Sequence, residues 1–489
     1  MMASSADSKT SAPQAQVQPS PNRPVNASAM ASNADHPRKS INLLRGWPST
    51  DLLPTAALNA ASQRLLGNPA LAAPALLYGP DPGFEPLRGA LAAWLADFYG
   101  TSSDVERIAV SGGASQSLAC ILQSFTDPAY TRAVWMVAPC YFLACPIFAD
   151  AGLGGKGRLR AVPEDEEGID LGFLEAGLRR SAEEDNAAAA AREGGEGEKS
   201  FKDPGPHRKL YRHVVYCVPS FSNPSGKTMS RRRREGLLEL ARRYDALIVC
   251  DDAPPPHDPP GKSFGHAVSN GSFSKLAGPG LRTGWTESSP DFAYGLSQTG
   301  STRSGGAPSQ FAAAVVYELL VSGGLAAHLR DALRPAYRRR HGLVAGALRR
   351  HLGPLYALPK DDENGGNDAN TAMKGVVRSL AGRDDVFGGY FVWFRLPGDL
   401  KADDVAQRCM AEENLAIGTG GLFAVQGDTN GPQFEHEVRL CFAWEDEADL
   451  EDGVLRLSRV LRRMLDGEPM RQGAAVETGK GGKGVDELK

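Results

Sequence analysis

The sequence predicts an α/β protein with two domains: a large domain in which helices flank a mostly parallel sheet, and a smaller α+β domain. Short apolar runs alternate with helical stretches, an order that favours right-handed crossovers between parallel strands. Small or polar residues follow directly on these runs, as expected at the ligand-binding edge of such a sheet. With 42% hydrophobic residues, a chain of 489 residues can bury a sizeable core.

The elements of the large domain are predicted from the spacing of apolar residues. Four apolar runs are typical of buried strands: Ile108–Val110, Val134–Ala138, Val214–Val218 and Leu247–Cys250. Between Leu118 and Phe125, apolar residues recur at the i, i+3, i+4, i+7 spacing of one buried helix face. Ser230 can cap another helix, in which the apolar residues from Leu237 to Ala241 share a face.

The C-terminal part of the chain predicts a second unit. Gly389–Leu396 and Val438–Phe442 are typical of strands, and residues 402–413 and 446–465 of helices. Strands and helices that alternate in this way, after a long interruption, indicate an α+β domain of its own.

Four stretches lack the apolar side chains of a folded core: residues 1–39, 182–207, 360–375 and 467–489. We therefore expect disordered ends and two inserted surface loops. The predicted division is a disordered segment 1–39, an N-terminal segment 40–75 that contributes to the small domain, a large domain 76–334 with the insertion 182–207, a small domain 335–466 with the insertion 360–375, and a disordered tail 467–489.

Charge and cysteine usage exclude several classes of protein. The formal net charge of −4 argues against a dedicated nucleic-acid or membrane-surface binder. The seven cysteines are odd in number and scattered, which is typical of buried thiols in a reducing compartment such as the cytoplasm. Neither they nor the nine histidines have the spacing of metal ligands. No apolar run approaches the roughly 18 residues of a membrane span.

Three predicted strand ends carry small or polar residues that could contact a ligand, and the first of them is suited to an anion. Ser-Gly-Gly-Ala-Ser after Val110 can present backbone N–H groups at a helix start, although such turns are also common without a ligand. Taken alone, Asn223-Pro224 is better explained as a plain turn than as a ligand-binding residue. Asp251 leaves an apolar strand, where a carboxylate is costly unless it has a partner.

The segment SFSKLAGPGLRTGW places Lys275 among small and apolar residues, with hydroxyls before it and Arg282 seven residues after it. Burial disfavours the charged form of a lysine, and a neutral amine can form an imine with an aldehyde. The alternative is an ordinary solvated surface lysine.

This segment closely resembles the cofactor-lysine segment of fold-type I, pyridoxal-phosphate-dependent aminotransferases of class I/II, most of all the branch with aminoadipate, kynurenine and aromatic aminotransferases. The resemblance spans roughly residues 40–465 except the insertions. Further segments match in the family's order: LLYGPDPGFEPLRGALAAWL, GGASQSL, APCYF, PSFSNPSG, VCDDA, GGYFVWFRLP and EVRLCFAW.

The resemblance implies pyridoxal 5'-phosphate as cofactor, and Lys275 as the residue that binds its aldehyde and moves the substrate proton. It implies that Asp251 pairs with the pyridine nitrogen and Tyr141 stacks on the ring, while Asn223 bonds the phenolic oxygen. The implied phosphate ligands are Ala114, Ser115, Ser272, Arg282 and, from the neighbouring subunit of a homodimer, Tyr78. The implied substrate-binding residues are Asn223, Arg439, which holds the α-carboxylate, and Gly46, which lies in the segment that closes over the substrate.

One position departs from the family's pattern. Pro254 stands where the family usually has a tyrosine that donates to the phenolic oxygen, and proline donates nothing. His257 is an alternative donor, or an exposed loop residue.

The leading hypothesis is an aminotransferase that moves an amino group between an L-amino acid and a 2-oxo acid by a ping-pong mechanism. The departure at Pro254 leaves two alternatives open: a lyase or decarboxylase of amino acids, or a catalytically weak relative that still binds the cofactor.

Overall fold

The computed structural model describes residues 39–155, 157–190, 201–251, 264–303, 308–356 and 388–470. The predicted segment 1–39 (except its last residue), the insertion 360–375 and most of the tail 467–489 lie outside the described residues. All described residues belong to one compact unit, Arg38–Val476.

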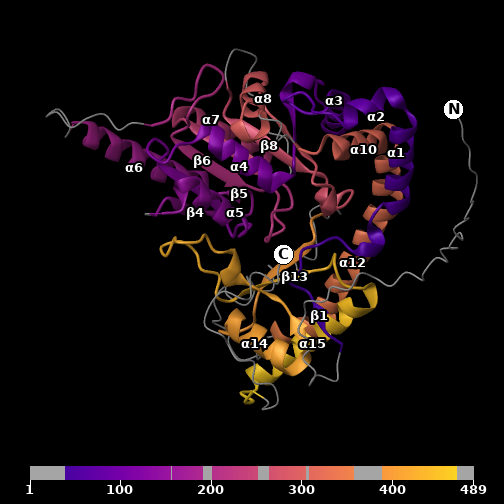
Figure 1. Cartoon of the computed structure of the whole chain (residues 1–489). Helices are drawn as coiled ribbons and strands as arrows, with labels where there is room; N and C mark the ends of the chain where they lie inside the picture. The colour runs from indigo at the N-terminus through magenta and orange to yellow at the C-terminus, as the bar shows by residue number, and fades with distance from the viewer. Residues whose placement is uncertain are drawn as a thin grey trace, which may run out of the picture. The chain divides into compact units, whose positions relative to one another are not determined.

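An eight-stranded sheet forms the centre of the large domain (Figure 1). In spatial order its strands are β2 (Ile108–Ser111), β9 (Gly284–Glu287), β8 (Ala267–Ser272), β7 (Ala246–Asp251), β6 (His213–Cys217), β3 (Ala133–Ala138), β4 (Leu159–Asp165) and β5 (Gly168–Ile169). The four pairs from β8 to β4 are parallel, and only β9 and β5 run against their neighbours. The predicted fold class is confirmed.

Helices cover both faces of this sheet. The side chains of β3, β6 and β7 alternate between two buried clusters, which explains why these strands are continuous apolar runs. One face packs on α4 (Ala114–Phe125), α5 (Ala144–Phe148) and α8 (Pro290–Ser297). The opposite face packs on α6 (Leu171–Ala190) and α7 (Arg231–Arg243). Ser230 caps α7 as predicted, since its hydroxyl accepts from the N–H of Arg233.

The β2 end of the sheet is covered by helices that precede β2 in the sequence and by one that follows β9. A third cluster joins β2 to α1 (Thr55–Gly67), α2 (Pro69–Ala75), α3 (Glu85–Tyr99) and α10 (Gln310–Val321). The short helices α9 (Gly300–Arg303) and α11 (Gly324–His328) flank α10 in sequence.

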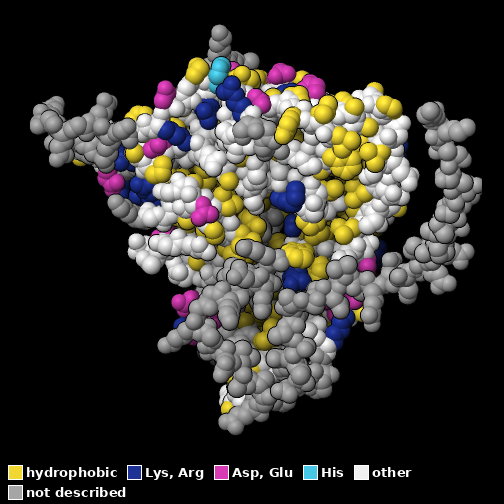
Figure 2. All heavy atoms as spheres, viewed as in Figure 1, with side chains coloured by type: hydrophobic (Ala, Val, Ile, Leu, Met, Phe, Trp, Pro, Cys, Tyr) yellow, Lys and Arg dark blue, Asp and Glu magenta, His cyan; other side chains and the backbone are white. Residues whose placement is uncertain are grey.

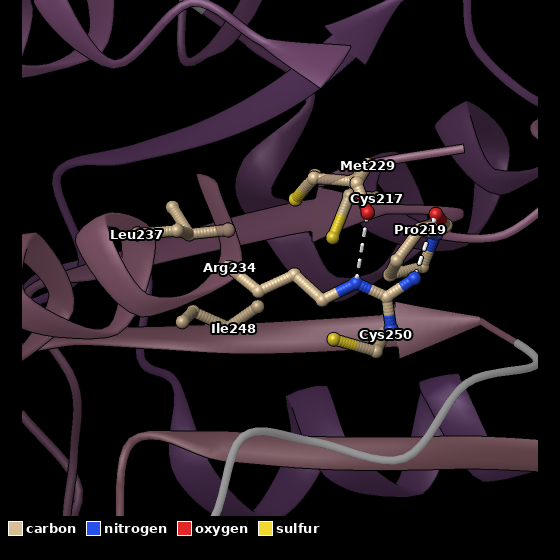
Figure 3. A pocket seen from close by; sticks show the side chains of 7 residues that line it. All are labelled: Cys217, Pro219, Met229, Arg234, Leu237, Ile248 and Cys250. Atoms are coloured by element: carbon tan, nitrogen blue, oxygen red, sulfur yellow. Dashed lines mark hydrogen bonds between the residues drawn. The ribbon is translucent and has the colours of Figure 1, made fainter. Parts of the chain in front are cut away.

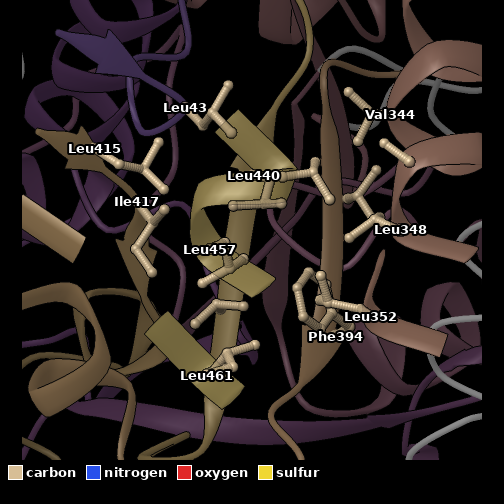
Figure 4. Packing of buried hydrophobic residues seen from close by; sticks show 14 of the residues in the cluster. Leu43, Val344, Leu348, Leu352, Phe394, Leu415, Ile417, Leu440, Leu457 and Leu461 are labelled. Carbon is tan, nitrogen blue, oxygen red and sulfur yellow. The ribbon is translucent and has the colours of Figure 1, made fainter. Parts of the chain in front are cut away.

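The small domain is built on a three-stranded antiparallel sheet in the order β10 (Phe391–Arg395), β13 (Glu437–Cys441) and β12 (Gly418–Thr419). Its helices are α12 (Arg334–Ala347), α14 (Ala402–Glu413) and α15 (Glu447–Leu465). Figure 4 shows how Leu43 and Leu415 pack with Leu440 and Leu457 in its core. The N-terminal strand β1 (Ile41–Asn42) joins this domain by pairing with β11 (Leu415–Ala416).

The structure adds detail to two predicted segments. Residues 40–75 are predicted to contribute to the small domain, and β1 does so, but Ala61, Leu65 and Ala75 are buried in the large domain, because α1 and α2 carry their apolar faces to α3 and α10. The insertion 182–207 was expected to be a loop, but α6 continues to Ala190, since its alanines and glutamates are strong helix formers.

The cysteines and the longer helices bear on the expectations about thiols and membrane spans. All seven cysteines are buried free thiols. Within the described part of the chain, no single helix is long and apolar enough to cross a membrane, and one bent pair, Gln310–Val321 with Gly324–Tyr356, meets the requirement by length and composition only.

Candidate active site

The carboxyl ends of β2, β3, β6, β7 and β8 share one edge of the large sheet, because these strands run in the same direction. Most of the predicted cofactor residues lie at these strand ends, as the last residue of a strand or shortly after it: Ala114, Ser115, Tyr141, Asn223, Asp251, Ser272 and Lys275. The topology therefore gathers at one edge residues that lie as much as 161 positions apart in the sequence, from Ala114 to Lys275.

The start of α4 is shaped to take an anion. Gly113 precedes the helix with a φ of +98°, and no side chain caps the N–H groups of the first turn, to which Ala114 and Ser115 belong. A Cβ on Gly113 would lie 2.6 Å from Nη2 of Arg282, which itself donates to the carbonyl of Gly112 at 2.8 Å. Free N–H groups and a guanidinium at one helix start fit a phosphate group.

Ser272 is engaged within its own turn. Its Oγ lies 2.9 Å from Oγ of Ser274 and accepts from the N–H of Ser274 at 3.1 Å. The predicted role of Ser272 toward the phosphate therefore stays a prediction.

Asp251 ends β7 and is held from two sides. The hydroxyl of Tyr216 donates to its Oδ2 at 2.8 Å, and Nδ2 of Asn270 lies 3.4 Å from its Oδ1. The same Nδ2 donates to the carbonyl of Ala114 at 3.0 Å, so this carboxylate is connected to the first residue of α4. A carboxylate beside an anion-binding helix start fits a phosphorylated pyridine, whose ring nitrogen needs an acid partner.

Lys275 lies at the end of a short 3-10 helix, Phe273–Lys275, and its side chain is exposed. Its Nζ donates to the carbonyl of Gly46 at 2.7 Å and lies 5.3 Å from the ring centroid of Tyr390. A Cβ on Gly46 would lie 2.8 Å from Cζ of Phe391, so only glycine fits this approach without displacing that ring. The N-terminal segment thus reaches the lysine through Gly46.

Arg439 lies on β13 with 4% of its surface exposed. Nη1 donates to Oδ1 of Asn223 at 2.9 Å, and Nη2 donates to the carbonyl of Leu44 at 2.7 Å. The guanidinium lies 3.9 Å from the ring centroid of Phe391 and 4.6 Å from that of Phe423. Burial lowers the pKa of Arg439 to about 10, so the side chain stays charged at neutral pH.

Asn223 is oriented by this contact. A guanidinium only donates hydrogen bonds, so the amide oxygen of Asn223 must face Arg439. The NH₂ group of Asn223 is then available as a donor to a ligand oxygen, which is the role predicted for it.

Tyr141 and Tyr78 occupy different surroundings. Tyr141 is half-buried and lies close enough to Arg439 and Tyr216 to affect the pKa of both. Tyr78 is 90% exposed. Three further residues of the sequence argument, Asp252, Pro254 and His257, lie outside the described residues.

Sequence reasoning missed Tyr216, Asn270 and the rings around Arg439. A signal existed for Tyr216, whose hydroxyl falls in the predicted buried strand Val214–Val218 and needs a partner there. Asn270 gave no such signal, because its strand β8 was not predicted. None existed for Phe391 and Phe423, because their contact with Arg439 depends on how separate segments pack.

A cavity of about 10 Å³ lies between β6, β7 and α7, lined by Cys217, Cys250, Leu237 and neighbouring side chains (Figure 3). It has room for about one water molecule. Arg234 beside it donates from Nε to the carbonyl of Met229 at 3.2 Å and from Nη2 to that of Pro219 at 3.1 Å. Arg234 thereby fixes both ends of the loop that carries Asn223.

Comparison with known proteins gives consistent results. Residues 38–254 match the family model "Aminotransferase class I and II". A Saccharomyces cerevisiae protein described as uncharacterized is 31% identical over 457 residues, covering 84% of this chain and 95% of that protein. Aromatic-amino-acid aminotransferase 1 of Thermococcus litoralis is 25% identical, over 87% of this chain and 88% of its own.

One solved structure is similar to this chain in both sequence and fold. It is the α-aminoadipate aminotransferase of Thermus thermophilus in complex with N-(5'-phosphopyridoxyl)-L-leucine. The two chains are 26% identical and superpose with a TM-score of 0.61, over 87% of this chain and 93% of that one.

Proposed function

The chain belongs to the class I and II aminotransferases, and from this premise we propose how its own residues transfer an amino group. The protein is a pyridoxal-phosphate-dependent aminotransferase that acts on amino-acid and 2-oxo-acid substrates. When bound, pyridoxal 5'-phosphate supplies an aldehyde that exchanges with the amino group and a ring that accepts electrons.

We assign the binding of the cofactor to the sheet edge. The N–H groups of Ala114 and Ser115, with Arg282, hold the phosphate, and Asp251 faces the pyridine nitrogen. Asn223 donates its NH₂ to the phenolic oxygen, and Tyr141 lies against the ring. The uncapped start of α4 beside Arg282, connected through Asn270 to Asp251, supports this assignment.

We assign the chemistry to Lys275 and the substrate carboxylate to Arg439. Nζ of Lys275 would move the proton that the Cα of the amino acid gives up during the transfer. Arg439 receives the α-carboxylate of the amino acid and of the 2-oxo acid in turn, because both substrates carry one. This alternation favours a ping-pong mechanism. The hydrogen bonds that bring Gly46 to Lys275 and Asn223 to Arg439 carry the proposal.

A half-reaction tests the proposed function. Purified holoenzyme is mixed with single L-amino acids in the absence of any 2-oxo acid, and the visible absorbance of the cofactor is followed. One or more amino acids should convert the cofactor to its amine form with release of the 2-oxo acid. An unchanged spectrum with a broad panel, or release of carbon dioxide or ammonia without an acceptor, would contradict amino-group transfer.

We further propose that two copies of the chain form a homodimer in which Tyr78 reaches the phosphate of the neighbouring site. Hydrophobic side chains gather on the face over α1, α2, α3 and α10 (Figure 2). Exposed large apolar side chains in this region are Leu66, Leu76, Leu77, Tyr78, Phe98 and Val321. Contiguous exposed apolar surface on this scale marks an interaction site, and a second copy would bury it.

The mass of the holoenzyme in solution tests the dimer. Light scattering should give twice the 52.0 kDa of the chain, and Tyr78→Phe should release the cofactor faster without changing that mass. A particle with the mass of one chain would exclude the shared site.

A further inference from the structure

Three polar side chains meet on the face of the large sheet that α4 covers. Val249 and Val268 of β7 and β8 belong to the cluster under α4, and because side chains alternate along a strand, Asp251 and Asn270 point to the same face. Tyr216 of β6 belongs to the same cluster. Asp251 and Asn270 are also direct neighbours in the register of β7 and β8.

These residues are buried where polar groups are costly. Tyr216 is 2% exposed and Asn270 is 1% exposed. Burial first, and then the nearby Asp251 carboxylate, raise the pKa of Tyr216 well above its ordinary value, so its hydroxyl keeps its proton and remains a donor. Tyr216 therefore donates to Asp251 over the whole range of pH in which the protein would work.

The side-chain amide of Asn270 is only half satisfied by hydrogen bonds. Its Nδ2 bonds Ala114 and approaches Asp251, but its Oδ1 is buried without a hydrogen-bond partner among the described residues. An unsatisfied buried carbonyl destabilises a fold, and an apolar side chain at the same position of the strand would avoid that penalty. The amide of Asn270 therefore lowers the stability of the fold relative to an apolar side chain, which indicates a role at the neighbouring site.

We propose that Tyr216 and Asn270 are positioning residues that hold the Asp251 carboxylate toward the pyridine nitrogen and fix it relative to the start of α4. Tyr216 occupies Oδ2, and Asn270 connects Oδ1 to the carbonyl of Ala114. The two ends of the cofactor, the ring nitrogen and the phosphate, are then bound by groups that belong to one hydrogen-bonded chain. This inference rests on the role proposed for Asp251.

The physical consequence concerns geometry. A carboxylate at a strand end can rotate about its χ2 angle, and an ion pair with a ring nitrogen is strongest when one oxygen lies in the plane of the ring. Partners on both oxygens limit that rotation before the cofactor binds. Their removal should weaken the ion pair without removing the negative charge.

The test compares Tyr216→Phe and Asn270→Leu with Tyr211→Phe as the matched control. Tyr211 is equally buried in the same cluster, but its hydroxyl donates to the backbone carbonyl of Gly265. Two properties of the holoenzymes are measured: the rate at which the cofactor leaves during dilution, and the pH at which its visible absorbance changes. Turnover of an amino acid is measured alongside.

We expect the cofactor to leave Tyr216→Phe about tenfold faster, the loss of one hydrogen bond to a charged group, with a similar fall in kcat and little change in KM. Asn270→Leu should behave in the same way. The absorbance change should shift in pH, because a less firmly protonated pyridine nitrogen withdraws fewer electrons from the bond to Lys275. Tyr211→Phe should lower only the melting temperature.

Asp251→Asn separates the failure of this inference from the failure of the proposed function. In one outcome, Asp251→Asn loses cofactor and turnover while Tyr216→Phe and Asn270→Leu equal the wild type in the rate of cofactor loss and in the pH of the absorbance change. In that case the positioning role is wrong and the role of Asp251 stands. If Asp251→Asn also equals the wild type, the role of Asp251 itself is wrong. In the Asp251→Asn background, Tyr216→Phe should neither speed cofactor release nor lower turnover any further, because Tyr216 acts on the cofactor only through the Asp251 carboxylate.

Discussion

Lys275→Ala should lower kcat by more than about 10³-fold in the holoenzyme while the chain still folds. General acid–base catalysis by a placed side chain contributes up to about 10⁴-fold, and Lys275 also anchors the cofactor. Folding should survive because the side chain is exposed and its truncation leaves no cavity in either core. The measurement is the half-reaction with an accepted amino acid, together with circular dichroism and thermal unfolding.

The control for this variant is Lys401→Ala, which removes an exposed lysine paired with Glu435 on the small domain. It should retain the turnover of the wild type. Borohydride reduction of the wild-type holoenzyme, followed by peptide mass analysis, should place the pyridoxyl group on Lys275. Turnover of Lys275→Ala above about 1% of wild type, or an adduct on another lysine, would refute the role assigned to this residue.

The sequence predicted those helices and strands whose own residues carry the full apolar pattern of the element, independently of their neighbours in space. Helix α14 begins and ends at the predicted residues 402 and 413, and the strands β3, β6 and β7 lie within a residue or two of their predicted bounds. β8 and β9 were not predicted. The segment Ala267–Ser272 contains serines, an asparagine and a glycine, and it is a strand because β7 and β9 supply its hydrogen bonds from either side.

The site was predictable only in part, for a similar reason. The charged residues Lys275, Asp251 and Arg439 occur in motifs that resemble those of the family, so the sequence could name them as candidates. Their partners could not be found in this way. Asn223 and Arg439 are 216 residues apart, and their contact exists because the loop after β6 and the strand β13 of the small domain come together. The same dependence on packing applies to Phe391 and Phe423, whose rings both lie against the guanidinium.

Arg439→Ala should reduce kcat/KM for amino acids by about 30- to 1,000-fold, mostly through a higher KM. Truncating one partner of a buried, hydrogen-bonded charge pair typically costs about 2–4 kcal/mol. Here the cost falls on the substrate, whose α-carboxylate would enter a site lined by Phe391 and Phe423 with no opposite charge. Asn223 also loses the hydrogen bond that its Oδ1 accepts from Nη1 of Arg439, so some loss of kcat should accompany the change in KM.

Two further variants make this prediction specific to charge and geometry. Arg439→Lys keeps a cation but offers no planar fork to a carboxylate, so it should recover only part of the lost affinity. Arg395→Ala removes an exposed arginine from the neighbouring strand β10, where it pairs with Glu437, and it should leave KM unchanged. If Arg439→Ala binds amino acids and 2-oxo acids as tightly as the wild type, the carboxylate must be held elsewhere. A rise in KM shared equally by Arg395→Ala would point instead to a general disturbance of the small-domain sheet.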